Sequence, residues 1–305
     1  MKEIGRLLTA MVTPFDENGN VYYEQAKKLA LALINSGSDG VVVSGTTGES
    51  PTLSKEEKLR LFVEVKSAIG NKGIVIAGTS SYNTAESIEI TKEAEKTGVD
   101  AFLLVVPSYN RPPQEGLYEH FKAIAKSTDL PCILYNVPSR TKTNMEAATT
   151  IKLSKIDNII GIKEASGDMK QVAKIISSTK PDFLVYSGND SDTLLILTLG
   201  GYGVISVASH LVGKQIKAMI YNFLSGEVEK AAEIHRHLLL LVDALFLVSN
   251  PIPIKYALNW INFRVGEPRL PLIDLDCQSD KKIPVQVRWV ISEYKIDLPI
   301  PKGGD

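Results

Sequence analysis

Cysteine is nearly absent from this chain, with only Cys132 and Cys277 among its 305 residues. Two cysteines so far apart in the sequence fit neither a disulfide framework nor a metal cluster. Long apolar runs are also missing: the longest, residues 237–248, contains Asp243 and is shorter than the roughly 20 residues that span a bilayer. The first 15 residues lack the apolar core of a signal peptide, because threonine and proline interrupt them. We therefore expect a cytoplasmic protein without a membrane span.

An excess of charge of either sign is lacking too, since 34 basic and 35 acidic residues leave a formal net charge of -1. Such a surface has no broad electrostatic field for nucleic acid or anionic lipid, so the expected partner is a small metabolite. Histidine is scarce and scattered, and the closest pair, His235 and His237, is spaced to point apart on a helix. We therefore expect no metal site.

What the sequence does contain is a regular alternation of short apolar, β-branched runs with segments of helical spacing. The helical segments begin with polar residues, as in the capping box Ser54-Lys55-Glu56-Glu57. Apolar strands separated by helices are typical of parallel sheets that are buried on both faces. The eight strand candidates are residues 7–13, 40–44, 74–77, 101–106, 132–136, 159–163, 183–187 and 204–207.

Eight such units predict an α/β fold, a closed (β/α)8 barrel. The alternative is a doubly wound open sheet, which typically has fewer strands and needs a topological switch point. After residue 207 only helical patterns follow, at 214–223, 226–248, 254–263 and 285–294. We therefore predict a barrel over residues 1–225 and a C-terminal helical region over residues 226–305.

Lys163 is the main candidate for chemistry, because active sites of these barrels lie at the carboxyl ends of the strands. Strand alternation predicts that it shares a face with Ile159 and Gly161, with Glu164 on the other face, and that Gly161 leaves room beside the amine. A lysine desolvated among apolar side chains has a lowered pKa and attacks carbonyl carbons near neutral pH. A lysine that reaches solvent or joins a structural ion pair is the alternative.

Polar side chains at the ends of neighbouring strands add further candidates. Tyr135 ends the fifth strand, so its phenol is either a proton shuttle beside Lys163 or a packed aromatic ring. Thr46 and Thr47 lie in a glycine-flanked turn that either holds a carboxylate or is a plain turn. Arg140 either grips a second carboxylate with its planar guanidinium or pairs with a surface acid.

These loops together resemble those of the dihydrodipicolinate synthase family, a group of pyruvate-dependent class I aldolases. The resemblance extends over nearly the whole chain, and its motifs occur in the same order and register as in the family. They are Gly45-Thr46-Thr47-Gly48-Glu49-Ser50, Tyr109-Asn110-Arg111-Pro112, Tyr135-Asn136-Val137-Pro138-Ser139-Arg140-Thr141, Gly161-Ile162-Lys163-Glu164-Ala165-Ser166-Gly167 and Asn250-Pro251-Ile252-Pro253.

The resemblance implies a lyase in which Lys163 forms a Schiff base with pyruvate, and the resulting enamine attacks L-aspartate-4-semialdehyde. Cyclisation with release from the lysine gives 4-hydroxy-tetrahydrodipicolinate, an early step toward diaminopimelate and lysine. Tyr135 would be the proton donor and acceptor, and Thr46 and Tyr109 would complete a hydroxyl relay. The neighbouring subunit would lend Tyr109, because the family typically forms a homotetramer, a dimer of dimers. No added cofactor is expected.

The same resemblance implies how the substrates are held: Thr47 and the backbone of Ile205 would bind the pyruvate carboxylate, and Arg140 the carboxylate of the aldehyde. Rival aldolases that resemble N-acetylneuraminate lyase or 2-keto-3-deoxygluconate aldolase share the lysine and the tyrosine but take polyol substrates. Arg140 favours the synthase. A barrel that binds a keto acid without catalysis is the other alternative, which the complete set of relay residues disfavours.

The resemblance also bears on feedback by lysine. Members that lysine inhibits carry a Tyr-Tyr pair before the asparagine of the Tyr109 loop, histidines after the threonine loop and an asparagine near position 82. Here those places hold Ser108, Lys55, Lys58 and Tyr82, while Glu86 remains. We therefore expect weak inhibition by lysine or none.

Overall fold

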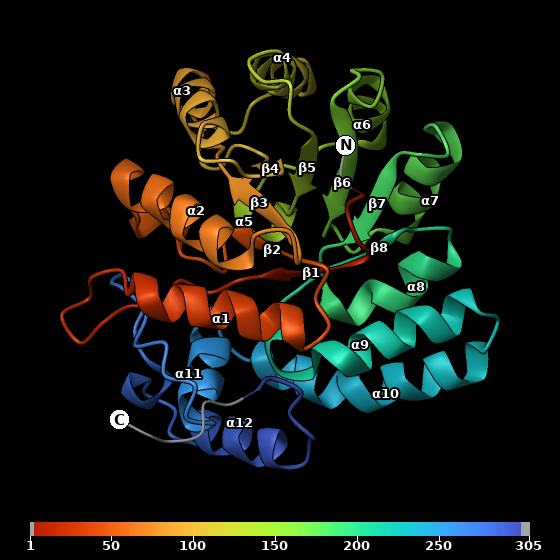
Figure 1. Ribbon diagram of the computed structural model, residues 1–305. Helices are drawn as coiled ribbons and strands as arrows, with labels where there is room; N and C mark the ends of the chain where they lie inside the picture. The colour runs from red at the N-terminus through yellow and green to blue at the C-terminus, as the bar shows by residue number, and fades with distance from the viewer. Residues whose placement is uncertain (1–2, 300–305) are drawn as a thin grey trace.

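The computed structural model describes residues 3–299 and has a ring of parallel strands inside a ring of helices (Figure 1). The strands follow one another in chain order around a closed barrel, and β8 pairs with β1 in parallel. The prediction of a (β/α)8 barrel is confirmed, and the open sheet is excluded. The strands are β1 (Leu7–Ala10), β2 (Gly40–Val43), β3 (Ile74–Gly78), β4 (Ala101–Val105), β5 (Cys132–Asn136), β6 (Ile159–Glu164), β7 (Leu184–Ser187) and β8 (Gly203–Ser206).

All eight predicted strands are present, and the largest difference lies at the end of β1. This strand ends at Ala10, three residues before its predicted end at Thr13. Beyond it the backbone bonds to other elements: Val12 N donates to His210 Nε2 at 3.2 Å, and Phe15 N donates to Val265 O at 2.9 Å. The segment after β1 therefore leaves the sheet to join the C-terminal part of the chain.

The helices begin where the sequence offers caps. Ser54 and Glu57 form the predicted capping box at the start of α2, and Asn83 accepts backbone hydrogen bonds at the start of α3. No helix among residues 3–299 has both the length and the apolar character needed to cross a membrane. The barrel helices are α1 (Tyr23–Asn35), α2 (Lys55–Ile69), α3 (Thr84–Glu95), α4 (Gln114–Ala125), α5 (Pro138–Thr141), α6 (Ala147–Leu153), α7 (Met169–Ser178), α8 (Thr193–Thr198) and α9 (Ser209–Leu224), with 3-10 turns at Ser50–Thr52 and Asp190–Asp192.

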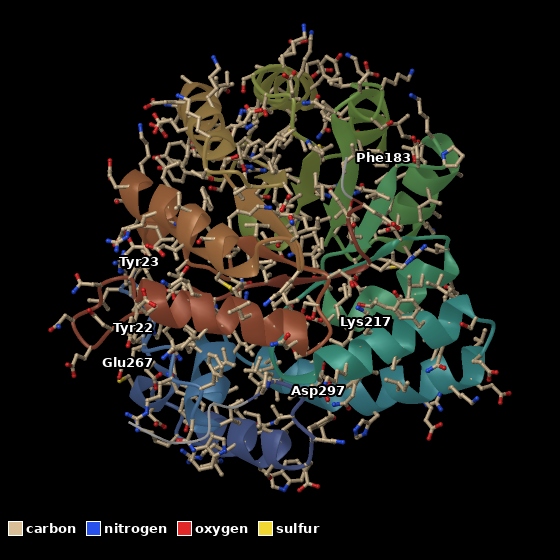
Figure 2. All side chains as sticks on the ribbon, viewed as in Figure 1. Tyr22, Tyr23, Phe183, Lys217, Glu267 and Asp297 are labelled. Carbon is tan, nitrogen blue, oxygen red and sulfur yellow. The ribbon has the colours of Figure 1, made fainter. Side chains whose placement is uncertain are left out.

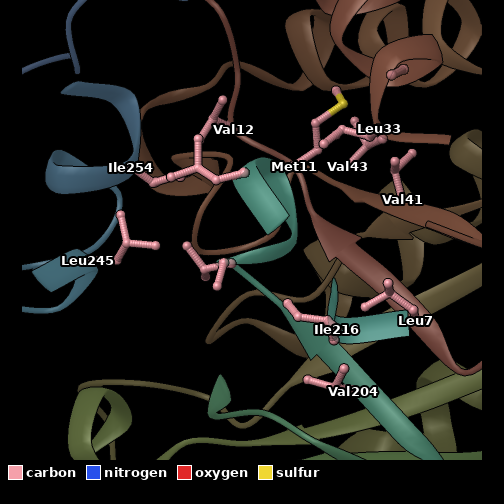
Figure 3. Packing of buried hydrophobic residues seen from close by; sticks show 14 of the residues in the cluster. Leu7, Met11, Val12, Leu33, Val41, Val43, Val204, Ile216, Leu245 and Ile254 are labelled. Carbon is pink, nitrogen blue, oxygen red and sulfur yellow. The ribbon is translucent and has the colours of Figure 1, made fainter. Parts of the chain in front are cut away.

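The C-terminal helices α10 (Val228–Leu245), α11 (Ile252–Trp260) and α12 (Lys282–Ser292) gather on the side of the barrel formed by α1 and α9 (Figure 1). Leu245 and Ile254 join the same buried cluster as Val12, just after β1 (Figure 3). The chain then returns to α9, where Asp297 N donates to Leu211 O at 2.7 Å (Figure 2). Because these helices share one core with the barrel, the division at residues 225 and 226 stays a prediction.

Strand β6 contains an irregularity that the sequence analysis missed. Cys132 of β5 pairs with Ile159, but the next residue of β5, Ile133, pairs with Gly161, so β6 holds one extra residue. Ile159 packs in the cluster outside the barrel, whereas Tyr135, the partner of Lys163, packs inside it. The prediction that Ile159 shares the face of Lys163 is therefore wrong, because an extra residue reverses the alternation.

Gly161 lies where β6 and β7 approach each other closely. A Cβ added there would lie 2.4 Å from the carbonyl oxygen of Leu184 on β7. A contact this short is incompatible with any side chain, so the absence of a Cβ at Gly161 allows β6 and β7 to approach each other. The prediction that Gly161 leaves room for the amine of Lys163 stays a prediction beside this finding.

Candidate active site

A cavity of about 370 Å³ opens at the carboxyl ends of the strands and contains three of the predicted site residues. Thr46 after β2, Tyr135 on β5 and Arg140 in α5 all line it. The cavity continues toward Lys58 and Tyr82, on and before the neighbouring helices α2 and α3. Loops from successive strands therefore bring hydroxyl groups and a guanidinium together at one end of the barrel.

Lys163 is buried at 5 % exposure, and its Nζ lies 4.5 Å from the ring centroid of Tyr135. The two residues are direct partners in the ladder between β5 and β6. Burial lowers the pKa of Lys163 to about 8; the nearby Asp190 carboxyl opposes this shift and the Arg140 guanidinium adds to it. About a tenth of this amine is therefore uncharged at pH 7, far more than for an ordinary lysine, and the uncharged form is the one that attacks a carbonyl carbon.

The Tyr135 phenol lies beside the Thr46 hydroxyl in the same cavity. Burial raises the pKa of Tyr135 to about 12, while the positive charge of Arg140 and a hydrogen bond with Thr46 act in the opposite direction. A phenol in this state keeps its proton at neutral pH and exchanges it with a neighbouring group. The arrangement is suited to relaying protons between Thr46 and a substrate on Lys163.

Thr47 and Arg140 are linked by a residue to which the sequence analysis gave no role. Asn250 Nδ2 donates to Thr47 Oγ1 at 2.9 Å, and Arg140 donates from a terminal nitrogen to Asn250 O at 3.1 Å. Asn250 immediately precedes Pro251 and α11. Asn250 belongs to one of the motifs of the family resemblance. Its contacts span 203 and 110 residues, so no local sequence pattern indicates them.

Ile205 on β8 lies in the barrel interior, in the same apolar cluster as Tyr135. The turn that follows β8 is held by Asp190, whose carboxyl oxygens accept hydrogen bonds from Ser206 Oγ and from the backbone of Val207 and Ala208. Burial raises the pKa of Asp190, and these donors oppose the rise. Asp190 was not a candidate, although it follows a strand end.

A buried ion pair joins the threonine loop to the C-terminal helices. Lys255 on α11 donates from Nζ to Glu49 Oε1 at 2.8 Å, and both side chains are almost completely buried. The same amine donates to Thr13 O at 3.1 Å and to Glu267 O at 2.9 Å. Glu49 has a left-handed backbone, φ 57°, which the surrounding contacts hold in place. The turn that presents Thr46 and Thr47 thus depends on α11.

Tyr109 is the one predicted catalytic residue that does not reach the site within this chain. Its side chain is 95 % exposed, and its backbone is left-handed with φ 70°. Its neighbour Ser108 lines the cavity, but Tyr109 itself does not. Within this chain the ring of Tyr109 is therefore open to solvent.

Two of the four histidines, His120 and His210, make buried structural contacts. Thr84 Oγ1 contacts His120 Nδ1 at 2.8 Å, and His210 Nδ1 contacts Val207 O at 2.9 Å. Burial lowers the pKa of both imidazoles to about 4, so both are neutral. Among residues 3–299, no group of three or more His, Cys, Asp or Glu side chains is arranged to hold a metal ion.

Known proteins are similar to this chain in both sequence and fold. The model of the dihydrodipicolinate synthetase family matches residues 3–288. A 4-hydroxy-tetrahydrodipicolinate synthase of Dehalococcoides mccartyi is 62% identical over 300 residues, 98% of this chain and 100% of that protein.

Two solved structures superpose closely on this chain. A dihydrodipicolinate synthase of Bacillus anthracis has a TM-score of 0.93 at 46% identity, covering 97% of this chain and 100% of its own. The enzyme of Cyanidioschyzon merolae, solved with lysine bound, has a TM-score of 0.92 at 48% identity, covering 95% and 97%.

Proposed function

The chain belongs to the dihydrodipicolinate synthetase family and has the 4-hydroxy-tetrahydrodipicolinate synthase activity of its relatives; we propose that Lys163 carries this activity as the Schiff-base nucleophile. The observation that supports Lys163 most is its buried amine, with a pKa lowered to about 8, above the ring of Tyr135 at the end of the barrel. The activity makes the protein a lyase of the class I aldolase type in the diaminopimelate route to lysine.

The proposed reaction starts when the Lys163 amine attacks C2 of pyruvate and water leaves, which forms a protonated imine. Loss of a proton from C3 gives an enamine, and its carbon attacks the aldehyde carbon of L-aspartate-4-semialdehyde. The amino group of the condensed product then attacks C2 and displaces the lysine, which closes the ring and frees the enzyme. Tyr135 moves the protons in these steps, with Thr46 beside it and Tyr109 as the third hydroxyl.

Substrate binding is proposed to involve both ends of the Asn250 bridge. Thr47 and the backbone of Ile205 would hold the pyruvate carboxylate, and Arg140 would hold the aldehyde carboxylate through charge-assisted hydrogen bonds. If so, Arg140→Ala raises KM for the aldehyde much more than KM for pyruvate. Equal losses for the two substrates would remove Arg140 from this role.

Borohydride trapping tests the central assignment. Reduction in the presence of pyruvate should inactivate the enzyme and attach a three-carbon adduct to Lys163, as peptide mapping by mass spectrometry would show. A Lys163→Met control should remain unlabelled. An adduct on another lysine, or none at all, would overturn the assignment.

The assembly and the compartment belong to the same proposal. We propose a homotetramer built from two dimers, in which each subunit of a dimer supplies Tyr109 to its partner's site, and a cytoplasmic location. The exposed Tyr109 ring supports the first part. Sedimentation equilibrium and cell fractionation test the two parts separately. Turnover with pyruvate and aspartate semialdehyde, compared with cleavage of sugar keto acids, tests the synthase against the polyol aldolases.

A further inference from the structure

Directly behind the Lys163 and Tyr135 pair, on the outer face of the barrel, lies a second pair of polar residues. Asn136 follows Tyr135, Glu164 follows Lys163, and the two are partners in the ladder between β5 and β6. Asn136 Nδ2 donates to Glu164 Oε1 at 3.0 Å and to Oε2 at 3.2 Å. Their exposures are 0% and 1%, so neither touches solvent.

The surroundings of Glu164 consist of hydrogen-bond donors. Besides Asn136, Ser166 N donates to Oε1 at 2.8 Å, and Gln171 Nε2 on α7 donates to Oε2 at 3.1 Å. Burial raises the pKa of Glu164, and these donors oppose the rise. A carboxylate accepts from all of them at once, whereas a protonated carboxyl or an amide turns one of its own hydrogens toward a donor. The site is therefore built for an ionised carboxylate.

The orientation of Asn136 is fixed as well. Its Oδ1 accepts a hydrogen bond from Met145 N at 3.0 Å, so its Nδ2 faces Glu164. Burying this amide and the carboxylate costs free energy that an apolar pair would avoid. Stability of the fold therefore does not explain why two buried strands carry a polar pair at this place.

The extra residue in β6 suggests what the pair does. Without it, Tyr135 would pair with Ile162, and Lys163 would pair with Asn136. Backbone hydrogen bonds can form in either register, so the side chains decide between them: a shift by one residue would move Lys163 to the outer face of the barrel. The bond between Asn136 and Glu164 forms only in the register that brings Tyr135 opposite Lys163.

We propose that Asn136 and Glu164 are positioning residues that hold β5 and β6 in this register and so keep the Tyr135 phenol next to the reacting Lys163 nitrogen. This inference rests on the proposed roles of Lys163 and Tyr135. The two residues touch neither substrate nor the reacting atoms, and they act through the backbone of the residues that precede them.

Asn136→Ala is the direct test, because it removes the bond between the strands and leaves Glu164 its donors from Ser166 and Gln171. A misplacement of about 1 Å costs a reaction up to roughly 100-fold, so kcat should fall by about tenfold or more. KM for pyruvate should change little. Glu164→Gln brings an amide hydrogen against a donor and should have the same effect on kcat. It replaces Asn136→Ala as the test if that variant does not fold.

Gln171→Leu is the matched control. It removes a hydrogen bond to the same carboxylate from the helix side and leaves the bond between the strands intact. Thermal unfolding should show a loss of stability similar to that of Asn136→Ala, while kcat stays within about twofold. An equal fall of kcat in both variants would overturn the proposal, because general loosening of the barrel would then explain it.

A double-mutant cycle separates positioning of Tyr135 from other effects. In a Tyr135→Phe background, Asn136→Ala should lower kcat by no more than about twofold, since the group it positions is gone. A full tenfold loss in that background would also overturn the proposal. Failure of the underlying function is distinguishable, since it would appear in the wild-type enzyme as a borohydride adduct away from Lys163.

Discussion

Two buried lysines in this chain differ in what surrounds the amine. Lys255 donates three hydrogen bonds, one of them to Glu49, so its charge is matched. Lys163 lies over an aromatic ring, and among residues 3–299 its amine makes no hydrogen bond or ion pair. Burial lowers the pKa of both amines, but only at Lys163 is the lone pair left for a substrate.

Lys163 therefore destabilises the fold at neutral pH. Its pKa is about 8 in the folded protein and about 10.4 when unfolded. Between those values the unfolded chain binds more protons than the folded one, so the free energy of unfolding rises with pH across that window. Below pH 8 the folded protein carries the whole cost of burying the charged amine, about 3 kcal/mol. Lys163→Met should raise the midpoint of thermal unfolding at pH 7, and the rise should be smaller at pH 9.5. A lower midpoint at pH 7 would contradict this.

Tyr135→Phe should lower kcat by about 100-fold to 10,000-fold, because a positioned acid and base contributes that much. Pyruvate should still bind, and borohydride should still trap it on Lys163, only more slowly. Steady-state kinetics with both substrates, together with trapping rates, check this. Turnover close to that of the wild type would exclude Tyr135 from proton transfer.

At the scale of whole elements, α11 contributes to the active site although it contains none of the predicted site residues. Lys255 joins it to Glu49, and Asn250 just before it joins Thr47 to Arg140. Lys255→Met leaves the Glu49 carboxylate buried without its cation, so we expect a loss of about 3–5 kcal/mol of stability. The double variant Lys255→Met, Glu49→Gln should recover part of the lost stability, as thermal unfolding would show. No recovery would show that the ion pair is not the cause.

Helix α2 carries the two lysines that bear on inhibition. Lys55 is paired with Glu89 and Glu93 of α3, while Lys58 lines the cavity and has Glu86 nearby. An ammonium ion about 4 Å from Lys58 would be repelled by roughly 4 kcal/mol at an effective dielectric of 20. Lysine should therefore inhibit weakly or not at all.

Titration of the initial rate with lysine at subsaturating pyruvate checks this, and Lys58→Ala should be the more sensitive enzyme. Half-inhibition of the wild type by submillimolar lysine would contradict the prediction.

The elements also show which features the sequence could predict. The strands, their order and the position of Lys163 at a strand end follow from local patterns and from a general rule for barrels. The extra residue in β6 does not, because no local pattern in the sequence marks the place where the pairing of β6 with β5 shifts. Asn250 lies in one of the motifs of the family resemblance, yet its contacts with Thr47 and Arg140 exist only after folding.

At the scale of the whole molecule, the proposed sharing of Tyr109 would leave a single chain with an incomplete site. Tyr109 is exposed on a left-handed turn and does not itself line the cavity that holds Tyr135 and Thr46. Lys163→Ala and Tyr109→Phe chains, each nearly inactive alone, should restore part of the activity when they are mixed in one dimer, because one of the two sites then has both residues. A fully active isolated monomer would count against this sharing.

The bridge made by Asn250 also limits how this enzyme could be redesigned. One side chain and its carbonyl connect Thr47, proposed to hold the keto acid, with Arg140, proposed to select the aldehyde. An exchange of Arg140 for a residue that suits another aldehyde therefore also disturbs the support of Thr47. Laboratory evolution toward new acceptors should yield paired changes at Asn250 and Arg140, because single changes at Arg140 should also cost a smaller share of the affinity for pyruvate.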